Sequence, residues 1–193
     1  MSEEMEQICV GHDGDVSFVS IACDSESNSF WGHVLPLVRG RHLVLDLALW
    51  RGDTGFLVQE ILLLTSMLQR RETRLWLARV PLTIARRLSN QKRKISGASF
   101  LSVEAPYYCT VCACDRFVVL DITPELIRRS HNVEESIPAQ TCPQCFSEMQ
   151  FNESPQGFLA FMDLFAAPVG PGGLRNSAEL AQQKSRAVST VES

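Results

Sequence analysis

The chain has 193 residues, of which 45% are hydrophobic and 21% are charged, and its formal net charge is −4. This length accommodates one ordinary domain with a small one attached, and the apolar content is that of a folded globular protein. The negative charge offers no overall positive field for nucleic acid, and no apolar stretch approaches the ~20 residues of a membrane span. The acidic N-terminus, Met-Ser-Glu-Glu-Met-Glu, lacks the basic and apolar regions of a secretory signal. We therefore expect a cytoplasmic protein without membrane contact.

About the first half of the chain alternates between strand-like and helix-like apolar patterns. Residues 1–12 carry no such pattern and are expected to be flexible. Strands are predicted over residues 16–23, 42–47, 74–80 and 99–103, and helices over residues 29–38, 56–70 and 81–88. Short links between alternating strands and helices favour a parallel-rich sheet. Residues 13–104 are therefore predicted to form an α/β domain of four or five strands.

A polar turn, Arg51-Gly-Asp-Thr-Gly-Phe56, precedes the longest predicted helix. Asp53 or Thr54 can serve as its N-cap, because a side-chain oxygen can accept a hydrogen bond from a free N–H of the first turn. An anion is also favourable at a helix N-terminus. The turn is therefore a helix cap, a partner-binding site, or both.

Two Cys-x-x-Cys pairs, Cys109/Cys112 and Cys142/Cys145, dominate the second part of the chain. Four thiolates in two such pairs can surround one Zn²⁺ and leave no position open for water or substrate. We therefore predict a structural zinc site. Cys114 offers a competing thiol, because Cys112 and Cys114 would point the same way in an extended segment. His131, between the pairs, is a weaker alternative ligand.

The cysteine segment, residues 105–166, is similar to zinc-ribbon modules. It contains a predicted strand over residues 116–122, a helix or turn over residues 124–129 and a short apolar helix over residues 157–165. Residues 167–193 are rich in Ser, Gln and Ala and have no aromatic residue, so they are predicted to be disordered.

The α/β part resembles the STAS domain, the fold of bacterial anti-sigma factor antagonists. The resemblance covers about residues 14–103, and these segments carry it: Leu43-Val-Leu-Asp46-Leu, Asp53-Thr54-Gly55 at the start of a helix, Arg74-Leu-Trp-Leu-Ala, and Pro81-Leu-Thr-Ile-Ala-Arg-Arg-Leu88. In that family a Ser or Thr of the turn is phosphorylated by a partner kinase, and the dephosphorylated protein binds that kinase. Aligned on Gly55, the usual phosphoacceptor position holds Asp53, and the neighbouring hydroxyl belongs to Thr54.

The resemblance implies a non-catalytic, partner-switching signalling protein that binds a kinase or a sigma-factor regulator, with Asp53, Thr54 and Gly55 in the contact surface. The sequence has no motif for nucleotide hydrolysis, acyl transfer or zinc proteolysis. The alternative is a nucleic-acid-associated factor. Its phosphate contacts would be Arg86, Arg87, Lys92, Arg93 and Lys94, a group without an intervening acid. A homo-oligomer is compatible with either function.

Overall fold

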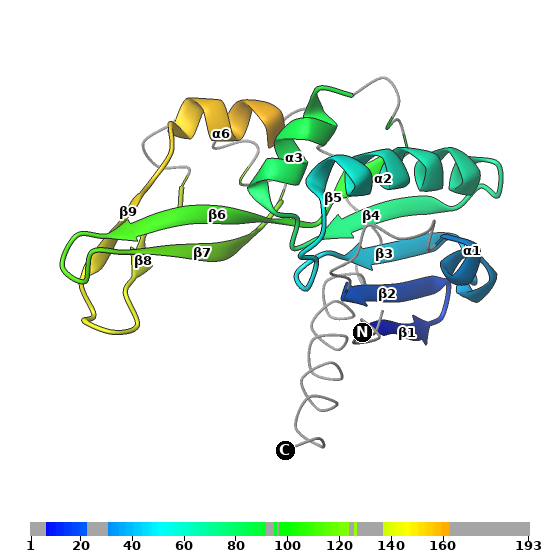
Figure 1. The fold of residues 1–193 in the computed structure, drawn as a ribbon, viewed down its shortest axis with the longest axis horizontal. Coiled ribbons are helices and arrows are strands. Elements are labelled where there is room, and N and C mark those ends of the chain that lie inside the picture. Colours follow the sequence, from blue (N-terminus) through cyan, green and yellow to red (C-terminus); the bar gives the residue numbers. More distant parts are fainter. Residues whose placement is uncertain are drawn as a thin grey trace, which may run out of the picture.

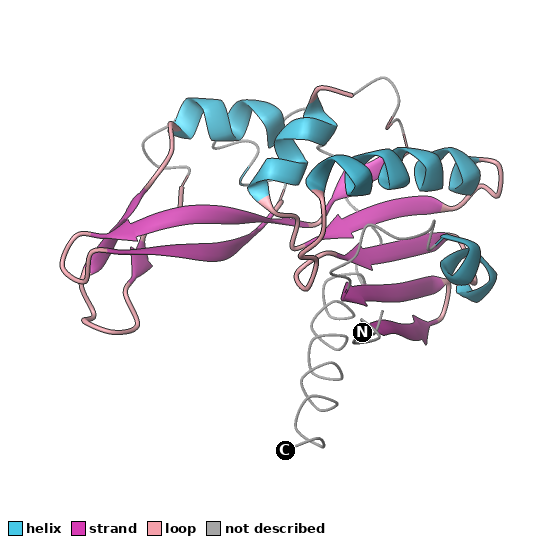
Figure 2. Ribbon diagram, viewed as in Figure 1, coloured by secondary structure: helices cyan, strands magenta, loops and turns pink. Residues whose placement is uncertain are grey.

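The structure, a computed structural model, describes residues 7–22, 31–91, 95, 97–123, 126 and 137–162 (Figure 1). It is a mixed α/β protein with two sheets (Figure 2). The elements in chain order are β1 (Gln7–Asp13), β2 (Val16–Ala22), α1 (Trp31–Val34), η1 (Leu35–Leu37), β3 (His42–Asp46), α2 (Thr54–Gln69), β4 (Arg74–Ala78), α3 (Leu82–Ser89), β5 (Ala98–Phe100), β6 (Ser102–Cys109), β7 (Cys114–Asp121), β8 (Gln140–Thr141), β9 (Glu148–Phe151) and α6 (Pro155–Met162). No helix of the described ranges is long and apolar enough to cross a membrane.

The first sheet has the strand order β1-β2-β3-β4-β5. The strands β2 to β5 are parallel, as the alternation of strands and helices predicts, and β1 is antiparallel to β2. Successive side chains of a strand point to opposite faces. In β3, Leu43 and Leu45 therefore join the main core with Leu57 and Ile61 of α2, whereas Val44 joins a second cluster on the other face.

The second cluster contains Phe18, Val44, Trp76 and Ala78, each at most 7% exposed. Both faces of β3 and β4 are thus buried, which explains why these strands are apolar along most of their length. In β3, the three consecutive apolar residues between His42 and Asp46 fit this two-sided burial.

The expectation that residues 1–12 are flexible is wrong for residues 7–12. They belong to β1, which pairs with β2 from Gln7 opposite Ala22 to Asp13 opposite Val16. The two strands are joined by a two-residue turn in which Gly14 has a φ of 55°. A glycine tolerates this left-handed conformation, which a tight hairpin turn requires.

The predicted strand over residues 99–103 passes from the first sheet to the second. At Leu101, between β5 and β6, the amide bonds to the carbonyl of Leu77 in the first sheet, while the carbonyl accepts the amide of Ile122 beyond β7. The predicted domain boundary between residues 104 and 105 therefore falls inside β6. One hydrophobic core also contains buried residues from both sides of that boundary, such as Val103 and Ala105.

The second sheet has the order β7-β6-β9-β8 and extends from the end of the first (Figure 2). Pro106 lies within β6, opposite Phe117 of β7. A proline lacks a donor, but here its carbonyl accepts the amide of Asn152 at 3.0 Å, just beyond the end of the β6–β9 ladder. The proline therefore lies where the strand needs no further N–H bond. The proposed helix or turn at 124–129, apart from residue 126, and the tail at 167–193 lie outside the described residues.

Candidate metal centre

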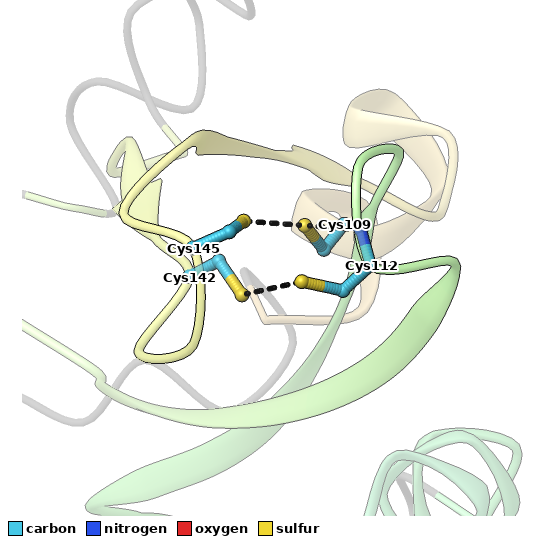
Figure 3. A group of neighbouring side chains, drawn as sticks. All are labelled: Cys109, Cys112, Cys142 and Cys145. Carbon is cyan, nitrogen blue, oxygen red and sulfur yellow. Dashed lines mark hydrogen bonds between the residues drawn. The ribbon is translucent and has the colours of Figure 1, made fainter.

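The two Cys-x-x-Cys pairs meet at one end of the second sheet (Figure 3). Cys109 is the last residue of β6, and Cys112 lies in the turn that leads to β7. Cys142 and Cys145 lie in the turn between β8 and β9. Each pair belongs to a hairpin turn, and β6 and β9 are neighbouring antiparallel strands, so the sheet itself brings the two turns face to face.

The four sulfurs form a compact group. The Sγ atoms of Cys109 and Cys145 are 3.5 Å apart and those of Cys112 and Cys142 are 3.9 Å apart. All four sulfurs lie within 4.8 Å of one another. Metal–sulfur bonds of about 2.3 Å in a tetrahedron place sulfurs about 3.8 Å apart. The four predicted ligands are therefore close enough to hold a metal ion.

The two turns share one feature of the backbone. The residue after the second cysteine has a positive φ in each: 51° at Ala113 and 60° at Phe146. This conformation folds each turn back on itself. In the first turn the amide of Cys112 points at the sulfur of Cys109, at 3.4 Å. In the second, the amide of Phe146 bonds to the carbonyl of Cys142 at 2.9 Å.

Backbone amides favour the ionised form of the second pair. The N–H of Ser147 lowers the pKa of Cys145 to about 6, and the N–H groups of Cys145 and Gln144 lower the pKa of Cys142. The thiol of Cys145 and burial raise the pKa of Cys112. Four neighbouring thiolates repel one another, so a cation is what allows all four to ionise together.

Cys114 is not part of this group. It lies on β7 directly opposite Cys109 and is half-buried. The left-handed conformation of Ala113 places Cys112 in the turn and Cys114 in the strand. The strand-alternation argument for Cys114 as a ligand therefore does not apply. The other alternative ligand, His131, lies outside the described residues.

A small aromatic cluster supports the site from the inner face of the second sheet. Tyr107 makes an edge contact with Phe151, and Phe151 makes one with Phe158 of α6, with centroid distances of 5.4 and 5.1 Å. The hydroxyl of Tyr107 donates to the carbonyl of Pro138 at 2.7 Å, and burial raises the pKa of Tyr107 to about 12. These contacts fix β6, β9 and α6 against one another beside the cysteines.

The turn at the start of α2 is tightly built. Asp53 is the N-cap, and its Oδ1 accepts the amide of Phe56 at 2.6 Å. Trp50 stacks on Phe56 and donates its indole N–H to the carbonyl of Gly52 at 3.0 Å. Thr54 is half-exposed, and within the described part of the chain no hydrogen bond involves its hydroxyl. The cap is thus Asp53 and not Thr54.

Two members of the basic group suggested for nucleic acid, Arg86 and Arg87, lie in the described residues, and both are exposed on α3. Arg86 forms an ion pair with Glu153, with Nη2 and Oε2 2.7 Å apart. Arg87 lies beside the start of α2, where its Nη1 would be 3.2 Å from a Cβ on Gly55. The remaining members at positions 92–94 lie outside the described residues.

A charged cluster that the sequence patterns did not predict lies at the carboxyl end of the parallel strands. Asp46 is the last residue of β3, and Arg79 comes directly after β4. Their side chains form a two-point ion pair, in which Nε of Arg79 is 2.8 Å from Oδ1 of Asp46. Glu104 is half-buried nearby, and burial raises its pKa although Arg51 and Arg79 act in the opposite direction. Each of the two apolar strands is followed or ended by a charged residue. This pattern could have indicated the cluster, because the carboxyl ends of parallel strands meet at one edge of a sheet.

No family model, no curated protein and no solved structure matches this chain.

Proposed function

We propose that this chain is a non-catalytic regulatory protein that binds other signalling proteins, in the manner of bacterial STAS domains, with a structural Zn²⁺ in its ribbon. The observation that carries the proposal is the turn of Asp53, Thr54 and Gly55. It is anchored by the Asp53 cap, lies at the N-terminus of a long helix, and presents a hydroxyl that makes no hydrogen bond within the described ranges. A helix N-terminus favours anionic groups, including a phosphate on Thr54.

The surroundings of Thr54 support a phosphate-responsive turn. The guanidinium of Arg87 lies close to Gly55, so a phosphate on Thr54 would meet a cation as well as the free amides of the first helical turn. The carboxylate of Asp53 already serves as the cap. Thr54 is therefore the proposed regulatory residue, and Asp53 and Gly55 hold it in place.

The exposed side of α2 supports a protein partner. It presents Gln59, Leu63, Ser66 and Met67, with no charged residue among them. Leu63 is 48% exposed and Met67 is 36% exposed, although solvent-facing positions of a surface helix are normally polar or charged. An uncharged stripe beside the Thr54 turn fits a protein surface better than a phosphate backbone.

Zinc is the metal we propose for the cysteine site. A tetrahedral set of four sulfurs selects zinc or iron, and a closed set of four thiolates leaves no position for substrate. Cys109 and Cys142 are fully buried, so the metal would act as a cross-link between the two turns. When bound, the metal would hold the four thiolates together and so stabilise the ribbon.

The nucleic-acid alternative has less support. Arg86 is engaged by Glu153, and Arg87 faces the start of α2. Two of the five proposed phosphate contacts are thus directed to other parts of the same chain. We retain this alternative as an outcome of the experiment below.

A pull-down from the native cell with zinc-loaded protein tests the proposed function. We expect the wild type to retain a protein kinase or a sigma-factor regulator in high salt, and Thr54→Ala and Leu63→Lys to lose it while keeping the fold. Gln144→Lys adds the same charge at the tip of the ribbon and should retain the partner. Recovery of nucleic acid that dissociates steeply with salt would favour the alternative instead.

A further inference from the structure

Strand β7 carries apolar side chains on both of its faces. Its inner face, with Val118 and Leu120, contributes to the hydrophobic core beside the cysteine turns. Its outer face carries Phe117, 66% exposed, and Val119, 43% exposed. A strand with one face in water normally alternates between apolar and polar residues, and Phe117 and Val119 depart from this pattern in the middle of the outer side of β7.

The neighbouring strand extends this apolar outer face. Phe117 lies opposite Pro106 of β6, and Tyr108 of β6 is two residues along on the same face. Tyr108 and Pro106 are partly exposed. The four side chains of Phe117, Val119, Pro106 and Tyr108, which we call the outer face, lie on one side of the second sheet, and the half-buried Glu104 of β6 lies opposite Val119 on the same side.

Two exposed carboxylates lie at the ends of this row. Asp115 and Asp121 are on the same side of β7 as Phe117 and Val119, at the regular spacing of two residues. One oxygen of Asp115 accepts a hydrogen bond from Asn152 at 3.2 Å, and the side chain remains exposed. From Asp115 to Asp121, this side of β7 therefore carries one acidic, two apolar and a second acidic side chain.

Within the described ranges, β7 is an edge strand that pairs with β6 on one side. An edge strand offers a row of backbone N–H and C=O groups to another strand, and proteins usually protect such edges when they are apolar. The edge and the outer face together suit the addition of an extended segment.

We propose that β7 binds an extended segment of a partner protein in which two apolar side chains lie between two basic ones at alternate positions. In an antiparallel pair the apolar residues would lie opposite Phe117 and Val119, and the basic residues opposite Asp115 and Asp121. Cross-strand apolar pairs and opposite charges each stabilise such a pairing. This surface is separate from the exposed side of α2, so the proposal goes beyond the function proposed above.

The charges distinguish this occupant from two others. A second copy of the chain, paired so that Phe117 faces Val119, would also place Asp115 opposite Asp121 at both ends, and like charges facing each other are destabilising. Nucleic acid would place phosphates beside the same carboxylates. A basic segment is the occupant that the two aspartates favour.

The test uses a synthetic nonapeptide with blocked ends, Thr-Lys-Thr-Val-Thr-Phe-Thr-Lys-Thr, titrated against the zinc-loaded full chain by calorimetry. We expect binding, and a weakening of at least about tenfold for the same peptide with Glu in place of both Lys. Phe117→Thr should weaken binding of the Lys peptide by roughly tenfold or more, because a buried aromatic contact is lost. Threonine keeps a high strand propensity, and zinc content confirms that the ribbon is intact.

A charge exchange makes the test independent of that variant. The double variant Asp115→Lys and Asp121→Lys should bind the Glu peptide in preference to the Lys peptide. Absence of binding, equal binding of both peptides, or unchanged binding by Phe117→Thr would overturn the proposal. It would also be overturned by a concentration-dependent dimer that Phe117→Thr abolishes, since the face would then belong to a second copy.

Discussion

Ala113 and Phe146 occupy the same position in the two cysteine turns, each directly after the second cysteine of its pair, with φ angles of 51° and 60°. Neither is a glycine, although a left-handed backbone costs other L-residues about 1–2 kcal/mol. The two turns thus share a left-handed residue at the same position, with the backbone strain that this conformation brings. In the first turn the amide of Cys112 points at the sulfur of Cys109, and in the second turn backbone amides bond to the sulfurs of Cys142 and Cys145.

The strain at Phe146 predicts a stabilising substitution. Phe146→Gly should raise the free energy of unfolding by about 1 kcal/mol, because glycine adopts a positive φ without a steric cost. The ring is 80% exposed, so its removal loses little packing. The control is Phe146→Ala, which removes the ring but keeps the strain and should leave stability nearly unchanged. Urea unfolding of the zinc-loaded proteins measures both, and equal stabilities of the two variants would contradict the role of the backbone.

Serine substitutions should distinguish the cysteines that bind the metal from the one that does not. Cys109→Ser and Cys142→Ser should lose the metal and increase hydrogen exchange in β6, β8 and β9. Cys114→Ser should keep the metal, because Cys114 lies in β7, outside the group of four sulfurs. Elemental analysis of each purified variant measures this, and loss of metal from Cys114→Ser would show that the ligand set is wrong.

His42 should titrate below its ordinary range. Its Nδ1 accepts the indole N–H of Trp76 at 3.1 Å, and burial, followed by the charge of Arg74, lowers the pKa of His42. The unfolded chain therefore takes up the proton first as the pH falls below about 6.5. The histidine's contribution to stability is complete above that pH and is lost as the pH falls toward the folded-state pKa.

NMR titration measures this directly, with the His42 signal assigned by its absence in His42→Gln. We expect a midpoint below about 6.5 and a simultaneous shift of the Trp76 indole proton. A midpoint at or above that value would refute the described hydrogen bond as the dominant state.

Gly52 should resist substitution. A Cβ at this position would lie 2.9 Å from Cζ2 of Trp50, whose ring is buried. Gly52→Ala should cost about 1–3 kcal/mol, the usual range for overpacking, and should alter tryptophan fluorescence. The matched control is Gly157→Ala in α6, where the nearest atom is 3.7 Å away and a helical alanine should stabilise by roughly 0.5–1 kcal/mol. Similar effects at both positions would contradict the close packing of the α2 turn.

Much of the first sheet could be predicted from the sequence because its patterns are local. The apolar stretches at β3 and β4 and the helical spacing of α2 place these elements within about two residues of their observed ends. The Cys-x-x-Cys spacing likewise identifies four residues that the structure brings together. Both predictions rest on patterns within short segments of the sequence, so they need no tertiary information.

The features that were missed depend on contacts between distant segments. The change of sheet at Leu101 is determined by bonds to Leu77 and Ile122. The ion pair of Asp46 and Arg79 follows from the register of two parallel strands. No pattern within a single segment indicates these contacts. The left-handed conformation between Cys112 and Cys114 could not be predicted either, because the residue that adopts it is Ala113 and not a glycine.

We propose that four thiolates of the ribbon hold one zinc ion in a closed site. Native mass spectrometry of the purified chain, with elemental analysis of the same sample, measures the metal directly. We expect one zinc per chain and slow alkylation of Cys109, Cys112, Cys142 and Cys145 in the folded state. A folded, metal-free chain whose four thiols are alkylated as fast as free cysteine would contradict the account.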